Sequence, residues 1–427
     1  MIPVKTLWHY FRTKRLTFTD RAVLQAYQAQ QLKRFAQKVL AQSAYFRPYS
    51  ALPVAEWPLM DKALMMAQFD QMNTAQLQRD QLLACARRSE TERDFTPKVG
   101  TYSVGLSSGT SGQRGVFVVS EREQQVWAGG MLAKMLPDGI FAGERVALFL
   151  RADNNLYHSV NNCWLSLEFY DLFAPFPAQL SRLQQQAPTI IVAPAQVLRA
   201  LALAVLDKKL VLDVKKVISV AEVLDMHDRR VLEQVFPDIG EVYQATEGFL
   251  AATCSHGTLH LNEEFLYIEP QWLDELHFTP LITDFTRRTQ PIVRYRLDDV
   301  LVRKVEPCPC GQATMAIERI EGRCDDQLLL LSHLGKPQVV FADLCTRVIA
   351  NALPLISDYR LIQQAEQSLH LVADCSQQQL AECHAQLVTA FEQQGIATES
   401  LEWQLTVQAV MPAFEQKRRR IIRKANP

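Results

Sequence analysis

Apolar residues change their spacing along this chain. Between Asp20 and Phe46 they recur at helical intervals, which predicts an early amphipathic helix. From about Val146 onward, short apolar runs alternate with segments long enough for helices. This alternation predicts βαβ units around a mostly parallel sheet. The expected strands are Val146–Leu150, Thr189–Ala193, Val217–Val220 and Glu241–Tyr243.

Each of these expected strands ends at a polar or chain-breaking residue. These end residues are Arg151, Pro194, Glu222 and the pair Thr246-Glu247. Ligands of open α/β sheets lie beyond the carboxyl ends of the strands. We therefore expect a ligand site near these residues.

The pattern after Gly322 mixes short strands with helices. Ser376–Gln394 predicts a helix that begins with a capping box formed by Ser376 and Gln379 and stops at Gly395. The other features are a short apolar run, Gln327–Leu331, a helix, Phe341–Ala350, and a half-buried strand, Leu401–Val410. Together they predict a small α+β domain of roughly a hundred residues.

The expected fold class is therefore α/β with two domains. A chain of 427 residues is too long for one ordinary core, which agrees with this division. We expect a large N-terminal domain with mostly parallel sheets over residues 1–322 and a small α+β domain over residues 323–427.

Composition narrows the class of protein. An apolar content of 48% and a formal net charge of −1 are typical of a soluble globular protein and give no sign of a nucleic-acid binder. Met1–Thr17 carries four basic residues but no continuous apolar core, so it is not a secretory signal. Ala187–Leu206 is interrupted by prolines and polar residues, so no membrane span is expected. Nine irregularly spaced cysteines favour reduced thiols or a metal site. We expect a cytoplasmic protein.

The first chemical signal is Ser107–Gly115, directly after the apolar stretch Tyr102–Leu106. Glycines alternate there with hydroxyl residues, so the backbone can turn tightly while N–H and O–H groups point at one target. Such a concavity suits an anion such as a polyphosphate. A Walker loop is excluded, because no Gly-Lys-Ser/Thr follows at the required spacing. A flexible Ser/Gly turn is the alternative interpretation of this segment alone.

Two later segments combine groups that a nucleotide needs. Tyr243–Gly248 contains a ring, a hydroxyl and a carboxylate, which can stack on a base, contact a phosphate and hold Mg²⁺. In Pro291–Val300, Asp298 and Asp299 follow two arginines. Surface ion pairs explain that arrangement, and the alternative is a buried aspartate that accepts both hydroxyls of a ribose.

Two charged segments have plain explanations. Arg319–Asp326, at the expected domain boundary, can be a linker. Glu415–Arg420 can be a solvated basic tail or a site for an acidic partner.

The order of these segments resembles the adenylate-forming superfamily of acyl-CoA synthetases and adenylation domains. The likeness covers most of the chain and is greatest to the phenylacetate–CoA ligase and coenzyme F390 synthetase-like branch. The segments that resemble this branch in particular are Leu259–Glu263, Leu281–Asp284, and Cys308–Gly311 before Arg323.

The resemblance implies a nucleotide site with assigned roles. The positions that match the phosphate loop are Ser107, Ser108, Gly109, Thr110, Ser111 and Gly112, with Thr110 near the β- and γ-phosphates. Tyr243 would stack on adenine, and Glu222 would lie beside the nucleotide. Asp299 would bind the ribose, with Arg323 next to it.

The resemblance also implies the catalytic residues Lys417, Thr246 and Glu247. Thr246 and Glu247 would serve the α-phosphate and Mg²⁺, and Lys417 would reach into the site during adenylation. Asp325 matches the hinge about which a mobile small domain rotates. Three departures from the family pattern are Gln244 and Gln416, where glycines are usual, and the short loop Gly112–Gly115 without the usual proline and lysine.

The activity that follows is that of an ATP-dependent, AMP-forming acid–thiol ligase. Such an enzyme activates a small carboxylic acid as acyl-AMP and passes it to coenzyme A or to the phosphopantetheine of an acyl carrier protein. On charge alone, Arg418, Arg419 and Arg420 could contact the phosphates of that acceptor. AMP transfer to an alcohol or phenol, and a nucleotide-binding module without turnover, are the alternatives. The sequence leaves the acid, the acceptor and the oligomeric state, including a homodimer, open.

Cysteines and one histidine suggest a metal site. The resemblance extends to zinc, which some members of this branch hold with such ligands, and Cys254, His260, Cys308 and Cys310 form a set that suits tetrahedral Zn²⁺. His256 is a competing ligand, and free cysteines in a turn are the alternative. Such a zinc would be structural.

A last group of side chains lies in a region that can line an acyl pocket. Its members are Tyr157, His158, Asn161, Asn162 and Trp164. For His158, a satisfied helix histidine is the plainer interpretation.

Overall fold

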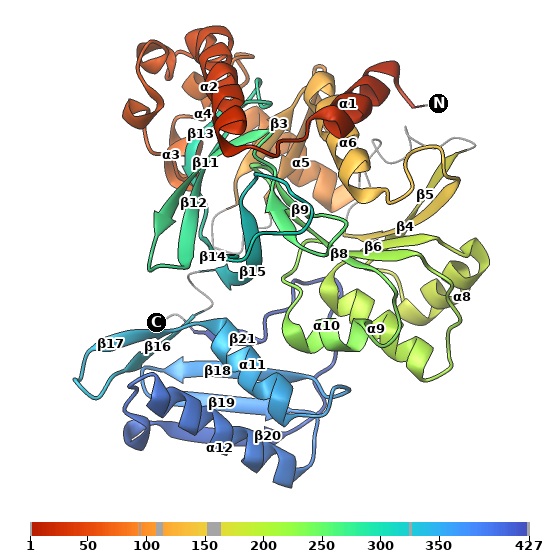
Figure 1. Cartoon of the computed structure of the whole chain (residues 1–427), viewed down its shortest axis with the longest axis vertical. Coiled ribbons are helices and arrows are strands. Elements are labelled where there is room, and N and C mark those ends of the chain that lie inside the picture. Colours follow the sequence, from red (N-terminus) through yellow and green to blue (C-terminus); the bar gives the residue numbers. More distant parts are fainter. Residues whose placement is uncertain are drawn as a thin grey trace.

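The computed structural model describes residues 2–92, 94, 96–107, 114–151, 164–323 and 327–424. Figure 1 shows a large upper part, which holds the residues up to 323, and a smaller lower part in blue. The residues between them, including Asp325, lie outside the described ranges.

Helices dominate the N-terminal part of the chain. The helix expected over Asp20–Phe46 begins as predicted, because the Asp20 carboxylate accepts hydrogen bonds from two N–H groups of its first turn. It ends earlier than expected, at Lys38, where Val39 leaves the helical conformation. The elements are α1 (Val4–Arg15), α2 (Arg21–Lys38), the 3₁₀ turns Leu40–Gln42, Arg47–Tyr49 and Val54–Glu56, then α3 (Lys62–Ala67), α4 (Phe69–Met72) and α5 (Arg79–Glu92).

A small antiparallel sheet follows, with the strand order β1-β2-β3. Leu106 pairs with Val116 at the end of this sheet, so pairing holds together the two ends of the segment expected to bind phosphate. The strands are β1 (Lys98–Val99), β2 (Tyr102–Leu106) and β3 (Val116–Val119), and α6 (Glu121–Met135) comes next.

The expected parallel strands are present at the expected places. Together with β5, which was not expected, they form the parallel part of a 12-stranded sheet, in the order β5-β4-β6-β7-β8, and every neighbouring pair among them is parallel. The strands are β4 (Glu144–Leu150), β5 (Leu165–Asp171), β6 (Ile190–Ala193), β7 (Lys216–Ser219) and β8 (Ile239–Ala245). The intervening helices are α8 (Phe176–Gln186), α9 (Ala195–Leu206) and α10 (Met226–Leu232).

The other half of this sheet is antiparallel, so the large domain is less parallel than expected. Short turns join several of its successive strands, and such turns can only reverse the chain, whereas parallel neighbours need a crossover. From β8 the order continues β9-β10-β15-β14-β12-β11, and β13 also pairs with β12. The strands are β9 (Gly248–Thr253), β10 (Leu259–Leu261), β11 (Leu266–Trp272), β12 (His277–Asp284), β13 (Ile292–Arg296), β14 (Asp299–Arg303) and β15 (Ala316–Arg323).

The C-terminal part is α+β, as expected. A β16-β17 hairpin precedes a four-stranded sheet with the order β20-β19-β18-β21. The predicted capping box at Ser376 and Gln379 is present at the start of α12, and the last long strand ends at Val407 rather than Val410. The elements are β16 (Leu328–Leu331), β17 (Pro337–Val340), α11 (Ala342–Ala352), β18 (Tyr359–Ala365), β19 (Ser368–Ala373), α12 (Gln377–Gln393), the 3₁₀ turn Thr398–Ser400, β20 (Glu402–Val407) and β21 (Ile421–Arg423).

Buried side chains form separate cores. Along β4, Val146 and Leu148 face one core of the large domain, and Ala147 and Phe149 face a second core on the opposite side of the sheet. The C-terminal part has its own core, built from residues 328–421. None of the helices in the described ranges has the length and apolar character to cross a membrane.

Candidate functional site

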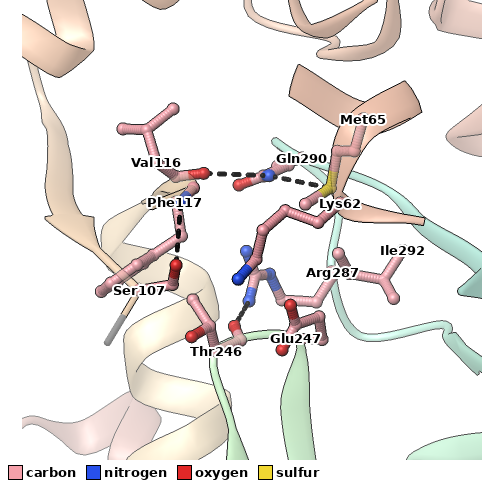
Figure 2. A pocket seen from close by; sticks show the side chains of 11 residues that line it. Lys62, Met65, Ser107, Val116, Phe117, Thr246, Glu247, Arg287, Gln290 and Ile292 are labelled. Atoms are coloured by element: carbon pink, nitrogen blue, oxygen red, sulfur yellow. Dashed lines mark hydrogen bonds between the residues drawn. The ribbon is translucent and has the colours of Figure 1, made fainter. Parts of the chain in front are cut away.

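Two adjoining cavities lie beyond the carboxyl end of β8. Figure 2 shows the first, which lies between the Thr246-Glu247 turn, Ser107 and Arg287. The second has a volume of about 280 Å³, and Asp299 is among the residues that line it. Lys62 and Glu247 line both, so the two cavities are neighbours.

Thr246 and Glu247 occupy the tight turn between β8 and β9, which places both of them at the carboxyl end of β8. The carbonyl oxygen of Thr246 accepts a hydrogen bond of 3.1 Å from Arg287 Nη1. Figure 2 shows Lys62 and Arg287 pointing into the space beside this turn. The Glu247 carboxylate therefore lies near two cations, Lys62 and Arg287, from distant parts of the chain.

Glu247 is buried, and burial raises the pKa of its carboxyl. A hydrogen bond from the Tyr295 hydroxyl and the charges of Lys62 and Arg287 act in the opposite direction. A carboxylate oxygen in this setting is a suitable ligand for a hard cation such as Mg²⁺, whose charge would favour the ionised form.

Ser107 lies at the wall of the first cavity. Its N–H donates to the carbonyl of Gly115 and its Oγ accepts from the Gly115 N–H, both at 2.8 Å. These bonds hold the two ends of the expected phosphate loop at the cavity. Ser108, Gly109, Thr110, Ser111 and Gly112 lie outside the described residues, as do the pocket candidates at 157–162.

Tyr243 and Asp299, the residues assigned to adenine and ribose, meet in the structure. The Tyr243 hydroxyl donates to Asp299 Oδ2 at 2.5 Å. Asp299 also lies opposite Arg323 in the β14–β15 register, although the Arg323 side chain is not described. For the segment Pro291–Val300, the sequence suggested a surface ion pair between its arginines and its aspartates. Arg294 does not take part in such a pair, because it forms a bidentate pair with Glu269.

Glu222 anchors the segment that contains Lys417. Its carboxylate accepts from Arg151 Nη2 at 3.2 Å, from Gln196 Nε2 at 2.8 Å and from the backbone N–H of Arg418 at 3.2 Å. β7 and β8 are adjacent parallel strands, so Glu222 and Glu247, which come after them, lie at the same end of the sheet. Lys417 itself is exposed and is not among the residues that line the two cavities.

Ala221, just before Glu222, has φ +65°, a left-handed conformation. Glycine adopts this conformation without strain, whereas a residue with Cβ pays about 1–2 kcal/mol. The backbone at Ala221 keeps the shape that a glycine would give.

The basic run at the C-terminus differs from the solvated tail expected from its sequence. Arg418 and Arg420 lie between the two domains and pair with Asp228 of the large domain and with Asp358 of the small one. Arg199 joins Asp228 from the other side at 3.4 Å. Because these arginines are occupied by aspartates, an acceptor phosphate is not their partner in this arrangement. Their burial follows from long-range pairing, which local charge does not reveal.

Cys254, His260, Cys308 and Cys310 are brought together, and their four ligand atoms lie within 4.8 Å of one another. The Cys254 and Cys308 sulfurs are 3.7 Å apart, and His260 Nε2 is 3.3 Å from the Cys310 sulfur. Two sulfurs on a tetrahedral zinc, each bonded at about 2.3 Å, would be about 3.8 Å apart. His260 Nδ1 lies 3.2 Å from the carbonyl of Thr314. This carbonyl can hold Nδ1 protonated and leave Nε2 free to bind a metal. The set therefore fits zinc.

Three functional candidates were not found from the sequence: Lys62, Arg287 and Tyr295. Lys62 opens the short helix α3, and nothing in its local pattern distinguishes it from a surface lysine. Met60 exchanges backbone hydrogen bonds with Arg294 and Arg296, and this contact brings Lys62 to the site. Arg287 follows the Asp284 motif by three residues, which is the single local signal of the three.

No protein-family model matches the sequence, and no curated protein matches it. Several solved structures are similar to this chain. The chain resembles 2-hydroxyisobutyryl-CoA ligase in its post-adenylation state with 2-HIB-AMP, at TM-score 0.67 and 14% identity over 94% of this chain and 89% of that one. It also resembles a GH3.15 acyl acid amido synthetase, at TM-score 0.56 and 11% identity over 90% and 86% of the two chains. The amide bond synthetase McbA from Marinactinospora thermotolerans gives TM-score 0.53 and 10% identity over 74% and 67%. The chain therefore has the fold of these adenylate-forming ligases.

The same 2-hydroxyisobutyryl-CoA ligase in its thioesterification state gives a lower TM-score, 0.55, at 15% identity over 93% of this chain and 89% of that one.

Proposed function

We propose that this protein is an ATP-dependent, AMP-forming ligase that activates a small carboxylic acid as acyl-AMP and transfers it to a thiol of coenzyme A or of a carrier protein. The observation that carries the proposal is the pair of neighbouring cavities. Ser107, Thr246 and Glu247 line the first, and Asp299, bonded to Tyr243, lines the second. The fold shared with acyl-AMP-forming ligases supports it.

ATP would bind across the two neighbouring cavities. Its ribose would bind Asp299 and its base would pack near Tyr243, while its phosphates would extend past Glu247 toward Ser107. Lys62 and Arg287 would face the phosphates, because both point into the first cavity. Glu247 would hold Mg²⁺, which supplies further positive charge at the phosphates when bound.

The first reaction joins a carboxylate oxygen to the α-phosphorus and breaks the bond to pyrophosphate, which leaves with its charge. Carboxylate and triphosphate repel each other, so the site must offset their charge before attack. Lys62 and Arg287 provide fixed cations in a partly buried space, where they act more strongly than in water. The second reaction joins the thiol sulfur to the acyl carbon, releases AMP and leaves a thioester.

Lys417 would act in the first reaction and leave the site for the second. In the present arrangement, Glu222 holds the segment around Lys417 beyond the carboxyl end of β7. Rotation of the C-terminal part about the region of Asp325 would bring Lys417 to the site for the first reaction, and a second rotation would move it away and admit the thiol.

The test is acid-dependent ATP–pyrophosphate exchange over a panel of carboxylic acids, followed by mass analysis of products with coenzyme A, an acyl carrier protein, an amine and an alcohol. We expect exchange with one class of acid and a thioester product. Lys417→Ala should lose exchange and keep thioester formation from preformed acyl-AMP. An AMP ester would instead favour nucleotidyl transfer to a hydroxyl, and the absence of exchange with every acid would contradict the proposal.

We also propose that the cluster of Cys254, His260, Cys308 and Cys310 holds a structural zinc. Cys308→Ser should lower bound zinc from about one per chain to near none after dialysis against a chelator, measured by elemental analysis, and should lower the melting temperature. Cys375→Ser, which changes a cysteine outside the cluster, is the matched control. Equal zinc content in the two variants would contradict this assignment.

A further inference from the structure

Helix α1 presents an apolar stripe to solvent. Val4, Trp8 and Phe11, spaced as i, i+4 and i+7, are 80%, 58% and 42% exposed. The buried side of the helix carries two threonines and Tyr10. An ordinary surface helix does the reverse and turns its apolar stripe toward the core.

Close packing fixes this orientation. A Cβ on Gly129 of α6 would lie 2.8 Å from both the carbonyl oxygen of Thr6 and the backbone nitrogen of Tyr10. The backbones of α1 and α6 are therefore in contact, which only glycine permits. The Tyr10 hydroxyl also accepts a hydrogen bond of 3.2 Å from the N–H of Ile140. For these reasons α1 cannot roll to bury its apolar stripe.

The stripe continues onto a neighbouring loop. The ring of Phe11 lies 6.3 Å from that of Phe141, which is 55% exposed. We call Val4, Trp8, Phe11 and Phe141 the aromatic face. Single exposed apolar residues are ordinary, but a contiguous row of them marks an interaction surface.

Cations surround the aromatic face. The exposed basic residues of α1 are Lys5, Lys14 and Arg15, and the Arg12 guanidinium lies 5.6 Å from the centre of the Trp8 ring. Residues 1–19 contain no aspartate or glutamate. Burial lowers the pKa of His9 to about 4, and the nearby charges of Arg12 and of Arg122 on α6 act in the same direction.

We propose that α1 docks this protein onto an anionic membrane surface, with the aromatic face inserted among the headgroups and the lysines and arginines against lipid phosphates. An amphipathic helix with aromatic residues on one side and basic residues around them is suited to that interface. Charge complementarity selects anionic lipid as the occupant, because the helix offers four cations and no anion. In Figure 1, α1 lies at the end of the molecule remote from the C-terminal part, so docking would leave that part free to move.

Vesicle sedimentation tests this proposal on the full chain, and it does not depend on the proposed ligase activity. We expect binding to vesicles of phosphatidylcholine with 30% phosphatidylglycerol, weak binding to pure phosphatidylcholine, and loss of binding at high salt. The exposed pair Lys14→Gln with Arg15→Gln should weaken the partition coefficient by about 25-fold, since each basic residue near an anionic surface contributes about a fivefold effect. Trp8→Ala with Phe11→Ala should weaken it by about tenfold or more.

Two controls separate membrane docking from other causes. Leu334→Ala with Met411→Ala removes exposed apolar side chains from the C-terminal part and should leave binding unchanged. Trp8→Phe should still bind. In vesicles that contain brominated lipid, which quenches nearby tryptophan, the fluorescence of this variant should fall much less than that of the wild type. Binding that does not depend on anionic lipid, or equal binding by all variants, overturns the proposal. A dimer in sedimentation equilibrium that Trp8→Ala with Phe11→Ala dissociates also overturns it, because the face would then belong to a second copy.

Discussion

Lys62→Met should lower acid-dependent ATP–pyrophosphate exchange by about 100- to 1000-fold, the loss typical of removing one preorganised group that stabilises developing charge. Lys62 lines both cavities together with Glu247 and points into the space where the proposed function places the triphosphate. Methionine keeps an unbranched stem beside Gly115 and Ser107 but removes the charge. The measurement is exchange at saturating acid and ATP, with circular dichroism to confirm the fold.

Lys336→Met is the matched control, because Lys336 is an exposed lysine in the β16-β17 hairpin. It should keep wild-type exchange. If Lys62→Met also stayed within threefold of the wild type, Lys62 would have no part in phosphate binding and the placement of the triphosphate would have to change.

The sequence predicted those parts of the fold that depend on local pattern. The apolar runs of β4, β6 and β7 are buried on both faces of a sheet, so they stand out as apolar segments. The start of α12 is visible because a capping box is a contact between residues three apart. The antiparallel half of the large sheet was missed, in part because strands such as β11 and β12 mix polar and apolar residues.

The roles assigned to the site residues stay predictions, but the structure brings several of these residues together. The meeting of Tyr243 with Asp299, and of Ser107 with Glu247, joins segments whose motifs are visible in the sequence. Lys62 could not be found, because a long-range pairing of Met60 with Tyr295 brings it to the site. The burial of Arg420 was missed because its partner Asp228 lies 192 residues away.

Asp228→Ala should release the C-terminal part from the large domain. Asp228 is fully buried and faces Arg199, Arg418 and Arg420. Burial alone would favour the protonated carboxyl, but the three guanidinium groups outweigh it and hold the pKa of Asp228 well below its usual range. The carboxylate therefore stays ionised between pH 5 and 8. Its contribution to stability is lost only when the pH falls below the carboxyl pKa of the unfolded chain, about 4, toward the lower pKa of the folded protein.

Without Asp228, three buried cations lose their shared partner. Breaking a buried ion pair by removing one member costs about 3–5 kcal/mol. Arg418 and Arg420 can recover hydration by moving into water, so we expect the docked arrangement to open. Hydrogen exchange of residues 415–421, which include the Arg418 N–H bonded to Glu222, should accelerate by about 100-fold or more.

Asp207→Ala controls for the loss of an aspartate as such, since Asp207 pairs with Lys209 at 2.9 Å while both side chains are more than half exposed. An exposed pair of this kind contributes about 0–1 kcal/mol, so exchange of residues 415–421 should not change. Because opening would also carry the Lys417 segment away from Glu222, Asp228→Ala should lose pyrophosphate exchange in parallel with its faster hydrogen exchange. If the amides of residues 415–421 were equally protected from hydrogen exchange in both variants, other contacts would hold the two parts together. The buried arginines would then not govern their docking.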